Sequence, residues 1–288
     1  MTEYLLELQA ISKAFYGVYA VQDVSLKLER GRVLGLIGQN GAGKSTLMNI
    51  LGGVIQPDAG EMRWRGESYT PQSPSEATDS GIAFIHQELN LFTNLTIAEN
   101  IYLGNFPRLR VGPFGFINRK QLNKQTSELL QSMGLKLAPT TSLDELSPGE
   151  RQLVEISKAL SIEADLIIFD EPTTSLTARE TEQLFQIIAD LRSAGKAIIY
   201  ISHILEDVLE LADDIAVLRD GQLIDSGSAA NFDIDRMISL MIGRQLEQLF
   251  PTKTNQPSAE VLLSLDGVSM SGIVKNIQFD LHRGEILG

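Results

Sequence analysis

A glycine-rich stretch in the first fifth of the chain has the residue types and spacing to bind phosphate. It fits the pattern G-x-x-x-x-G-K-[ST]. Glycines let backbone N–H groups approach an anion, Lys44 would add a cation near the outer phosphates, and Ser45 would add a hydroxyl ligand for Mg²⁺. A chance match is expected in roughly one chain in a hundred of this length, so we predict a nucleotide phosphate site. Its residues are Gly38, Gln39, Asn40, Gly41, Ala42, Gly43, Lys44, Ser45 and Thr46.

The sequence on either side puts this stretch between a strand and a helix. Residues 32–37 form an apolar run of strand length. After the stretch, apolar residues recur at helical spacing, at Leu47, Ile50, Leu51 and Val54. The unpaired N–H groups of a first helical turn, together with the helix dipole, favour an anion at that point.

Two carboxylates follow a second apolar run. Residues 166–169 have the unbroken hydrophobicity of a strand covered on both faces, as in a parallel sheet, and the run ends in Asp170 and Glu171. Acids at the end of a buried strand are costly unless chemistry needs them. Asp170 would help to hold Mg²⁺, and Glu171 would accept a proton from an attacking water. The alternative is an ordinary turn.

A histidine ends the next predicted strand. Residues 184–191 show helical spacing, and the apolar run 197–201 leads to His203. A strand, crossover helix and strand form a right-handed parallel unit, which would bring Glu171 and His203 to the same sheet edge as the phosphate loop. His203 could then hydrogen-bond a terminal phosphate; the alternative is a structural histidine.

Two further features have both a local and a functional interpretation. Phe15 precedes a turn at Gly17, and it could stack on a nucleotide base or pack in the core. Residues 147–150 open a helix with Ser147 at the N-cap, Pro148 at N1 and Glu150 at N3, which taken alone is a capping box.

Other segments indicate the remaining elements. Strand-like runs occur at residues 5–11, 24–28 and 82–85, and a short hairpin is expected at 60–66. Residues 97–145 change character, because Leu122, Leu130 and Met133 fit helical spacing. We predict a mostly helical insertion.

Composition bounds the class of protein. The chain has 288 residues, of which 43% are hydrophobic and 21% charged, so we expect a folded globular protein with one large or two smaller cores. Without cysteine, disulfides, thiolate zinc sites and thiol nucleophiles are excluded. A net charge of −13 opposes binding to nucleic acid or anionic lipid. Because of this negative charge, any membrane partner should be a protein rather than the lipid surface. We find neither a membrane-spanning run nor an export signal.

Five motifs in order and spacing resemble the ATPase domain of an ABC transporter. The phosphate loop resembles Walker A, Gln87 the Q-loop, residues 146–150 the signature, residues 168–171 Walker B, and His203 the switch histidine. The resemblance covers residues 4 to about 230.

The resemblance implies a fold and a set of roles. The fold would be α/β, a P-loop NTPase of ABC type with a mixed central sheet on a RecA-like core, a small antiparallel β subdomain and a helical subdomain. The cofactors would be ATP and Mg²⁺, and the chain would be an ATPase. The implied catalytic residues are Glu171, His203 and Gln87, and the implied metal ligands are Ser45, Gln87 and Asp170. Phe15 would stack on adenine, and Ser147, Gly149 and Glu150 would contact, in trans, the γ-phosphate held by an opposite domain.

Two departures from the family pattern point to one branch. Pro148 and Glu150 alter the usual LSGGQ, and Thr177 stands where aspartate is common. Together with residues 81–91 and 95–101, these changes resemble the branch that imports ribose, galactose or xylose-type sugars. The implied partners are membrane permease subunits and, indirectly, a periplasmic or extracellular sugar-binding protein, with the chain peripheral on the cytoplasmic face of the cell membrane.

An internal repeat indicates a second domain. Residues 24–35 and 277–288 align with five identities. We therefore predict an ATPase domain at 1–245 with the helical insertion at about 97–160, a linker at 246–259, and the start of a second ABC domain at 260–288. The chain would be the first half of a tandem protein, weakly active alone, and its site would be completed by a second ABC domain from the same full-length chain or from a homodimer.

A rival function belongs to another class. A soluble tandem ABC ATPase could act as a switch on the ribosome or on nucleic acid. Such proteins typically join their domains by a long basic helical arm, whereas the predicted linker here is short and nearly uncharged. We therefore favour sugar import and expect no nucleic-acid partner.

Overall fold

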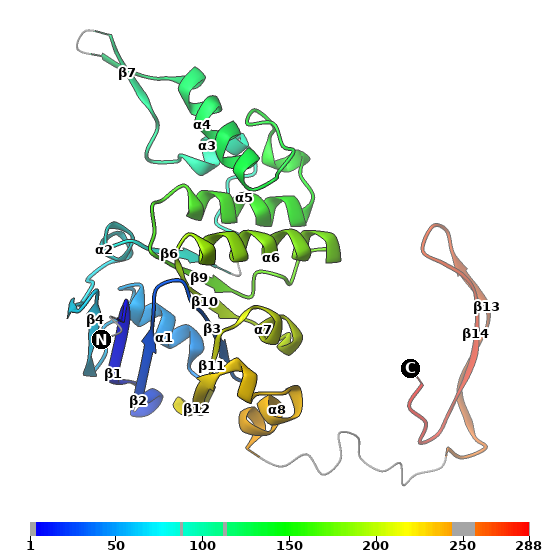
Figure 1. Cartoon of the computed structure of the whole chain (residues 1–288). Coiled ribbons are helices and arrows are strands. Elements are labelled where there is room, and N and C mark those ends of the chain that lie inside the picture. Colours follow the sequence, from blue (N-terminus) through cyan, green and yellow to red (C-terminus); the bar gives the residue numbers. More distant parts are fainter. Residues whose placement is uncertain (1–3, 87–88, 112–113, 244–256, 288) are drawn as a thin grey trace. The chain divides into compact units, whose positions relative to one another are not determined.

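The computed structural model describes residues 4–86, 89–111, 114–243 and 257–287 (Figure 1). The chain divides into two units, Met1–Arg244 and Gln245–Gly288. No helix among the described residues is both long enough and apolar enough to cross a bilayer.

A six-stranded mixed sheet forms the centre of the first unit, with strand order β12-β11-β3-β10-β9-β6. Its strands are β3 (Val33–Ile37), β6 (Ile82–Ile85), β9 (Leu166–Asp170), β10 (Ala197–Ile201), β11 (Asp214–Arg219) and β12 (Gln222–Ser228). Five of the strands are parallel, and β12 alone runs antiparallel to its neighbour β11. Every residue of β3 and β10 is buried, as the unbroken apolar runs predict for strands covered on both faces.

Alternate side chains of the central strands enter two different cores. Phe169 and Tyr200 face the core that includes Leu184. That core is built on the helices α5 (Pro148–Leu160), α6 (Ala178–Ser193), α7 (Leu205–Leu211) and α8 (Ile234–Ile242). Ile168 and Ile199 face the opposite core, formed with helix α1 (Lys44–Leu51) and a second sheet. The sheet therefore lies between two hydrophobic layers. Figure 1 shows α5 and α6 on one side of the sheet and α1 on the other.

The second sheet is antiparallel, with strand order β2-β1-β4-β5. Its strands are β1 (Leu6–Phe15), β2 (Val18–Leu28), β4 (Ala59–Trp64) and β5 (Glu67–Ser68). The predicted hairpin at 60–66 is the β4–β5 pair. The short helix α2 (Pro74–Asp79) follows this sheet along the chain.

The segment between β6 and α5 contains both helices and a hairpin. Its elements are α3 (Ile97–Ile101), β7 (Arg108–Val111), β8 (Phe114–Ile117), α4 (Arg119–Ser132) and the 3₁₀ turn Leu143–Glu145. Leu122, Leu130 and Met133 are buried, as their helical spacing predicts. The β7–β8 pair was not expected from the sequence; it extends at the top of the picture, beyond α4 (Figure 1).

The second unit is a hairpin of β13 (Val261–Met270) and β14 (Val274–His282) that repeats details of β1 and β2. Ile11 pairs with Val24 in the first hairpin, and Val268 pairs with Ile277 in the second. In each hairpin a serine hydroxyl accepts a hydrogen bond from a backbone N–H across the pair.

The two hairpins share these bonds at matching positions but differ in length. The bond is Asp23 N to Ser12 Oγ (2.9 Å) in the first and Asn276 N to Ser269 Oγ (2.8 Å) in the second, and both donors have a φ of +53°. Val24 lies 13 positions after Ile11, but Ile277 lies only nine positions after Val268, so the second hairpin has a shorter tip.

The central strand β9 offers a test of the packing. Replacing Ile168, which is 0% exposed, by alanine should lower the free energy of unfolding by about 2–5 kcal/mol, because it removes buried methyl groups and leaves a cavity. Urea unfolding measures the change. The matched change Ile162→Ala, at a side chain that is 39% exposed, should cost less than about 1 kcal/mol; equal losses would contradict the assigned core.

Candidate functional site

The glycine-rich loop joins β3 to α1 and depends on glycine at specific positions. Gly43 is the N-cap of α1 and has a φ of +103°, in the left-handed region that L side chains avoid. A Cβ at Gly43 would overlap the carbonyl oxygen of Ala20, and one at Gly38 would overlap that of Leu218. The loop is therefore held against two neighbouring strands by backbone contacts that leave no room for a side chain.

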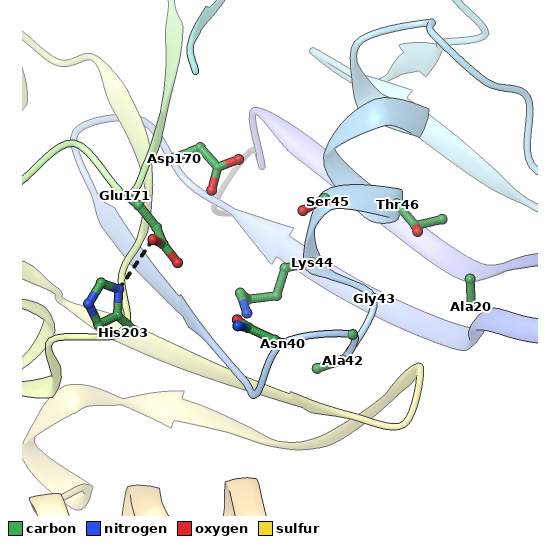
Figure 2. Close-up of a pocket in the computed structure, with 11 residues that line it drawn as sticks. Ala20, Asn40, Ala42, Gly43, Lys44, Ser45, Thr46, Asp170, Glu171 and His203 are labelled. Atoms are coloured by element: carbon green, nitrogen blue, oxygen red, sulfur yellow. Dashed lines mark ion pairs between the residues drawn. The ribbon is translucent and has the colours of Figure 1, made fainter. Parts of the chain in front are cut away.

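A pocket of about 640 Å³ opens at this loop. Its lining brings the loop together with the carboxyl ends of β9 and β10 (Figure 2). The lining residues are Ala20, Asn40, Gly41, Ala42, Gly43, Lys44, Ser45, Thr46, Asp170, Glu171 and His203. Three segments that are distant in sequence thus meet at one sheet edge, as the strand order predicts.

The side chain of Lys44 hydrogen-bonds the backbone of its own loop. Its Nζ donates hydrogen bonds to the carbonyl oxygens of Gly38 (2.7 Å) and Gln39 (3.1 Å). Burial lowers the pKa of Lys44, while the negative charges of Glu171 and Asp170 oppose that shift. The cation therefore stands between the loop carbonyls and the two acids, where an anionic phosphate could bind it.

Glu171 and His203 form a pair across the pocket wall. His203 Nδ1 lies 3.2 Å from Glu171 Oε2, and Figure 2 shows the contact as a dashed line. Glu171 has a φ of +49°, and its backbone N–H donates to the carbonyl of Ile201 (2.9 Å). Left-handed backbone at a residue other than glycine costs about 1–3 kcal/mol and persists where the surroundings impose it. Here it turns the chain after β9 so that the carboxylate faces His203.

The surroundings of Asp170 disfavour its ionised form. Burial, then the neighbouring charge of Glu171, raises the pKa of Asp170, and the charges of His86 and Lys44 offset this only in part. Asp170 and Ser45 both line the pocket and supply a carboxylate and a hydroxyl, the oxygen ligands that Mg²⁺ prefers. A divalent cation would fit this donor set and relieve the repulsion between the acids.

Some predicted residues lie elsewhere. Phe15, at the end of β1, is 42% exposed and does not line the pocket, and its ring centroid lies 5.8 Å from Lys13 Nζ. Ala20 of β2 lines the pocket instead; an alanine carries no signal that could have identified it from the sequence. Gln87 lies outside the described residues, and the stacking role of Phe15 stays a prediction.

The predicted signature residues form the start of α5 and do not line this pocket. The capping box is confirmed: Ser147 N donates to Glu150 Oε2 (2.8 Å), and Glu150 N donates to Ser147 Oγ (3.2 Å). A Cβ at Gly149 would overlap the carboxylate of Glu180, which belongs to a second capping box, that of Thr177 at the start of α6. Thr177 thus caps the N-terminus of α6, and aspartate, the residue common at this position in the family, is also a good N-cap residue.

Comparison with known families and proteins gives consistent matches. A family model described as ABC transporter matches residues 21–174. A protein of Pseudomonas syringae pv. tomato, provisionally named a ribose/galactose/methyl galactoside import ATP-binding protein, is 48% identical over 285 residues, 99% of this chain and 54% of that protein. A similarly named protein of Agrobacterium fabrum is 45% identical over 286 residues, 99% of this chain and 55% of that protein. The chain therefore spans about half the length of these curated relatives.

Solved structures match the fold. A nucleotide-free ATP-binding cassette from an ABC transporter has a TM-score of 0.67 at 27% identity, covering 78% of this chain and 91% of that chain. Another such cassette, in its ADP conformation, has a TM-score of 0.68 at 26% identity, covering 83% of this chain and 95% of that chain. These likenesses confirm the predicted fold class.

The charge on Asp170 should reduce the stability of the ligand-free protein. Because its pKa is raised on folding, the folded chain holds this proton more tightly than the unfolded chain, so stability falls as pH rises through the raised pKa and the loss persists at neutral pH. Asp170→Asn should therefore have a higher Tm than wild type at pH 7 without Mg²⁺ or nucleotide, and the difference should shrink toward pH 4. Thermal unfolding across this range tests it. The exposed change Asp220→Asn is the control, and a pH-independent difference at Asp170 would contradict the charge explanation.

Proposed function

The chain belongs to the ABC transporter family, and from this premise we propose that it binds and hydrolyses ATP as a subunit of an importer that energises uptake of a sugar through a membrane permease. One observation carries the catalytic part: the phosphate loop, two acids and a histidine line a single pocket. The names of relatives 45–48% identical to the chain support a sugar of the ribose or galactose type.

The pocket supplies each group that phosphoryl transfer to water requires. The loop N–H groups and Lys44 would hold the phosphates of ATP, and Phe15 would stack on the adenine. Ser45 and Asp170, together with Gln87, would hold Mg²⁺, which neutralises charge developing on the transferred group. Two features of the pocket fit a Mg²⁺ ion: the oxygen atoms of Ser45 and Asp170 that line it, and the raised pKa of Asp170, which a nearby cation would lower.

Glu171 would act as general base. The water oxygen attacks the γ-phosphorus, the bond to the bridging oxygen of ADP breaks, and a water proton passes to the Glu171 carboxylate. His203, 3.2 Å from that carboxylate, would hydrogen-bond the γ-phosphate and hold the base in place. ADP and phosphate then leave.

A second ABC domain would complete the site. We propose that Ser147, Gly149 and Glu150 contact the γ-phosphate bound by an opposite domain, since the start of α5 carries the positive end of a helix dipole and is not part of this chain's own pocket. The repeated hairpin supports a second ABC domain that starts at about residue 260. The chain alone should therefore hydrolyse ATP slowly.

We also propose a surface for the permease. Leu89 and Phe92 are exposed apolar residues in the segment after β6, close in sequence to the predicted Q-loop. A permease bound there would put the chain on the cytoplasmic face of the membrane, and a sugar-binding protein outside would take part only through the permease.

Replacing the proposed base should separate binding from turnover. In the chain expressed together with the proposed second ABC domain, Glu171→Gln should lower kcat for ATP by at least about 100-fold, because the amide cannot take a proton. Phosphate release measures turnover, and calorimetry with ATP and Mg²⁺ should give a Kd within about threefold of wild type. Glu182→Gln, on an exposed face of α6, is the control and should change neither value. Unchanged turnover in Glu171→Gln would remove Glu171 from this role.

The permease surface can be tested by co-purification. Leu89→Ala combined with Phe92→Ala should reduce recovery of a co-expressed candidate permease by at least about fivefold, since two apolar contacts worth about 1–2 kcal/mol together are lost. ATP binding should be unaffected. Phe116→Ala, at another exposed phenylalanine, is the matched control; equal recovery of all variants would exclude the surface.

A further inference from the structure

A polar cluster with two buried hydroxyl-bearing side chains and a partly buried carboxylate, that of Asp207, lies next to the pocket residues in sequence without lining the pocket. Thr173 Oγ1 donates a hydrogen bond to Asp207 Oδ2 (3.1 Å), and the hydroxyl of Tyr200 donates to the same oxygen (3.4 Å). Thr173 is 7% exposed and Tyr200 is fully buried. Two hydroxyls thus converge on a single oxygen of a partly buried carboxylate.

The members of this cluster belong to the segments that carry the proposed catalytic pair. Thr173 follows Glu171 by two residues, and Asp207 follows His203 by four, in the first turn of α7. The two segments are therefore joined twice, once at the pocket by Glu171 and His203 and once in the interior by Thr173 and Asp207. The hydroxyl of Tyr200 fastens the second junction to β10.

The turn between β10 and α7 is fixed as well. The N–H of Ile204 donates to Ser202 Oγ (3.0 Å), so the residues on both sides of His203 have side-chain or backbone anchors. Burial raises the pKa of Asp207, while the hydrogen bonds from Thr173 and Tyr200 and the charge of His203 lower it and that of Glu206 raises it. The two donated bonds favour the carboxylate form, which is the better acceptor.

We propose that Asp207 is a positioning residue, which through Thr173 and Tyr200 sets the distance between Glu171 and His203. None of the three lines the pocket. A general base must lie within hydrogen-bond reach of its water, and a displacement of about 1 Å can cost about 100-fold in rate. Loosening the interior junction should therefore slow the chemical step and spare binding. This inference rests on the proposed ATPase function.

Removing one hydroxyl tests the proposal in the full-length protein. Thr173→Val keeps the shape of the side chain and should lower kcat by about 10- to 100-fold, with KM for ATP within about threefold of wild type. Thr173→Ser restores the donor and should recover kcat to within about threefold of wild type. Tyr200→Phe removes the longer bond and should lower kcat by a smaller factor, about 3- to 10-fold.

A matched control separates positioning from general stability. Thr126 in α4 is also fully buried, and its hydroxyl donates to the Leu122 carbonyl (2.9 Å), far from the pocket in sequence. Thr126→Val should destabilise the fold by a similar amount in urea unfolding and leave kcat unchanged. In a Glu171→Gln background, Thr173→Val should lower the remaining turnover no further. The reason is that Thr173 is proposed to act only by positioning the Glu171 carboxylate, which this variant lacks.

The outcomes are distinguishable from failure of the function itself. If wild type binds no ATP, the proposed function fails. If wild type hydrolyses ATP and Thr173→Val equals Thr126→Val in kcat, only the positioning role is overturned. If Thr173→Val does not fold, Tyr200→Phe decides. An unchanged kcat in that variant overturns the positioning role, and a reduced kcat with unchanged KM supports it.

Discussion

The parallel register of β3, β10 and β9 is the constraint on which the site depends. Ile201 pairs with Leu36 on one side and with Asp170 on the other, so the three strands end at nearly the same level. The phosphate loop, the turn at Glu171 and the turn at His203 all leave the sheet there. A shift of one residue in β9 would exchange the faces of Ile168 and Phe169, which enter different cores, and the hydrophobic pattern therefore fixes the geometry of the pocket.

The same sheet edge brings two neighbouring carboxylates together, Asp170 and Glu171. Asp170 ends a buried strand, its pKa is raised, and its neighbour Glu171 adopts a left-handed backbone conformation. Lys44 already donates to two loop carbonyls. A nucleotide with its metal ion would supply opposite charge to both acids and to the lysine, so ligand binding would relieve the electrostatic repulsion at this edge and stabilise the folded chain.

Much of this arrangement follows from local sequence. The central strands, the helix after the phosphate loop and the capping box at Ser147 are set by periodicity and by end residues. The meeting of Glu171 and His203 follows from topology. By contrast, the β7–β8 hairpin, the Ala20 wall and the junction of Thr173 with Asp207 depend on how side chains and loops from distant segments meet in space, and residue types alone do not encode that. The position of Phe15 outside the pocket belongs to the same class.

The second hairpin repeats the strand pairing of the first but has a shorter tip. In the first hairpin the tip carries both Phe15 and Ala20, which are the predicted base contact and a wall of the pocket. In the second hairpin the pairing ends at Met270 and Val274, and only Ser271, Gly272 and Ile273 lie between them. The repeat therefore preserves the paired strands and the serine hydrogen bond but not the tip that borders the pocket, so the part of the hairpin that would meet a ligand varies independently of the scaffold that carries it.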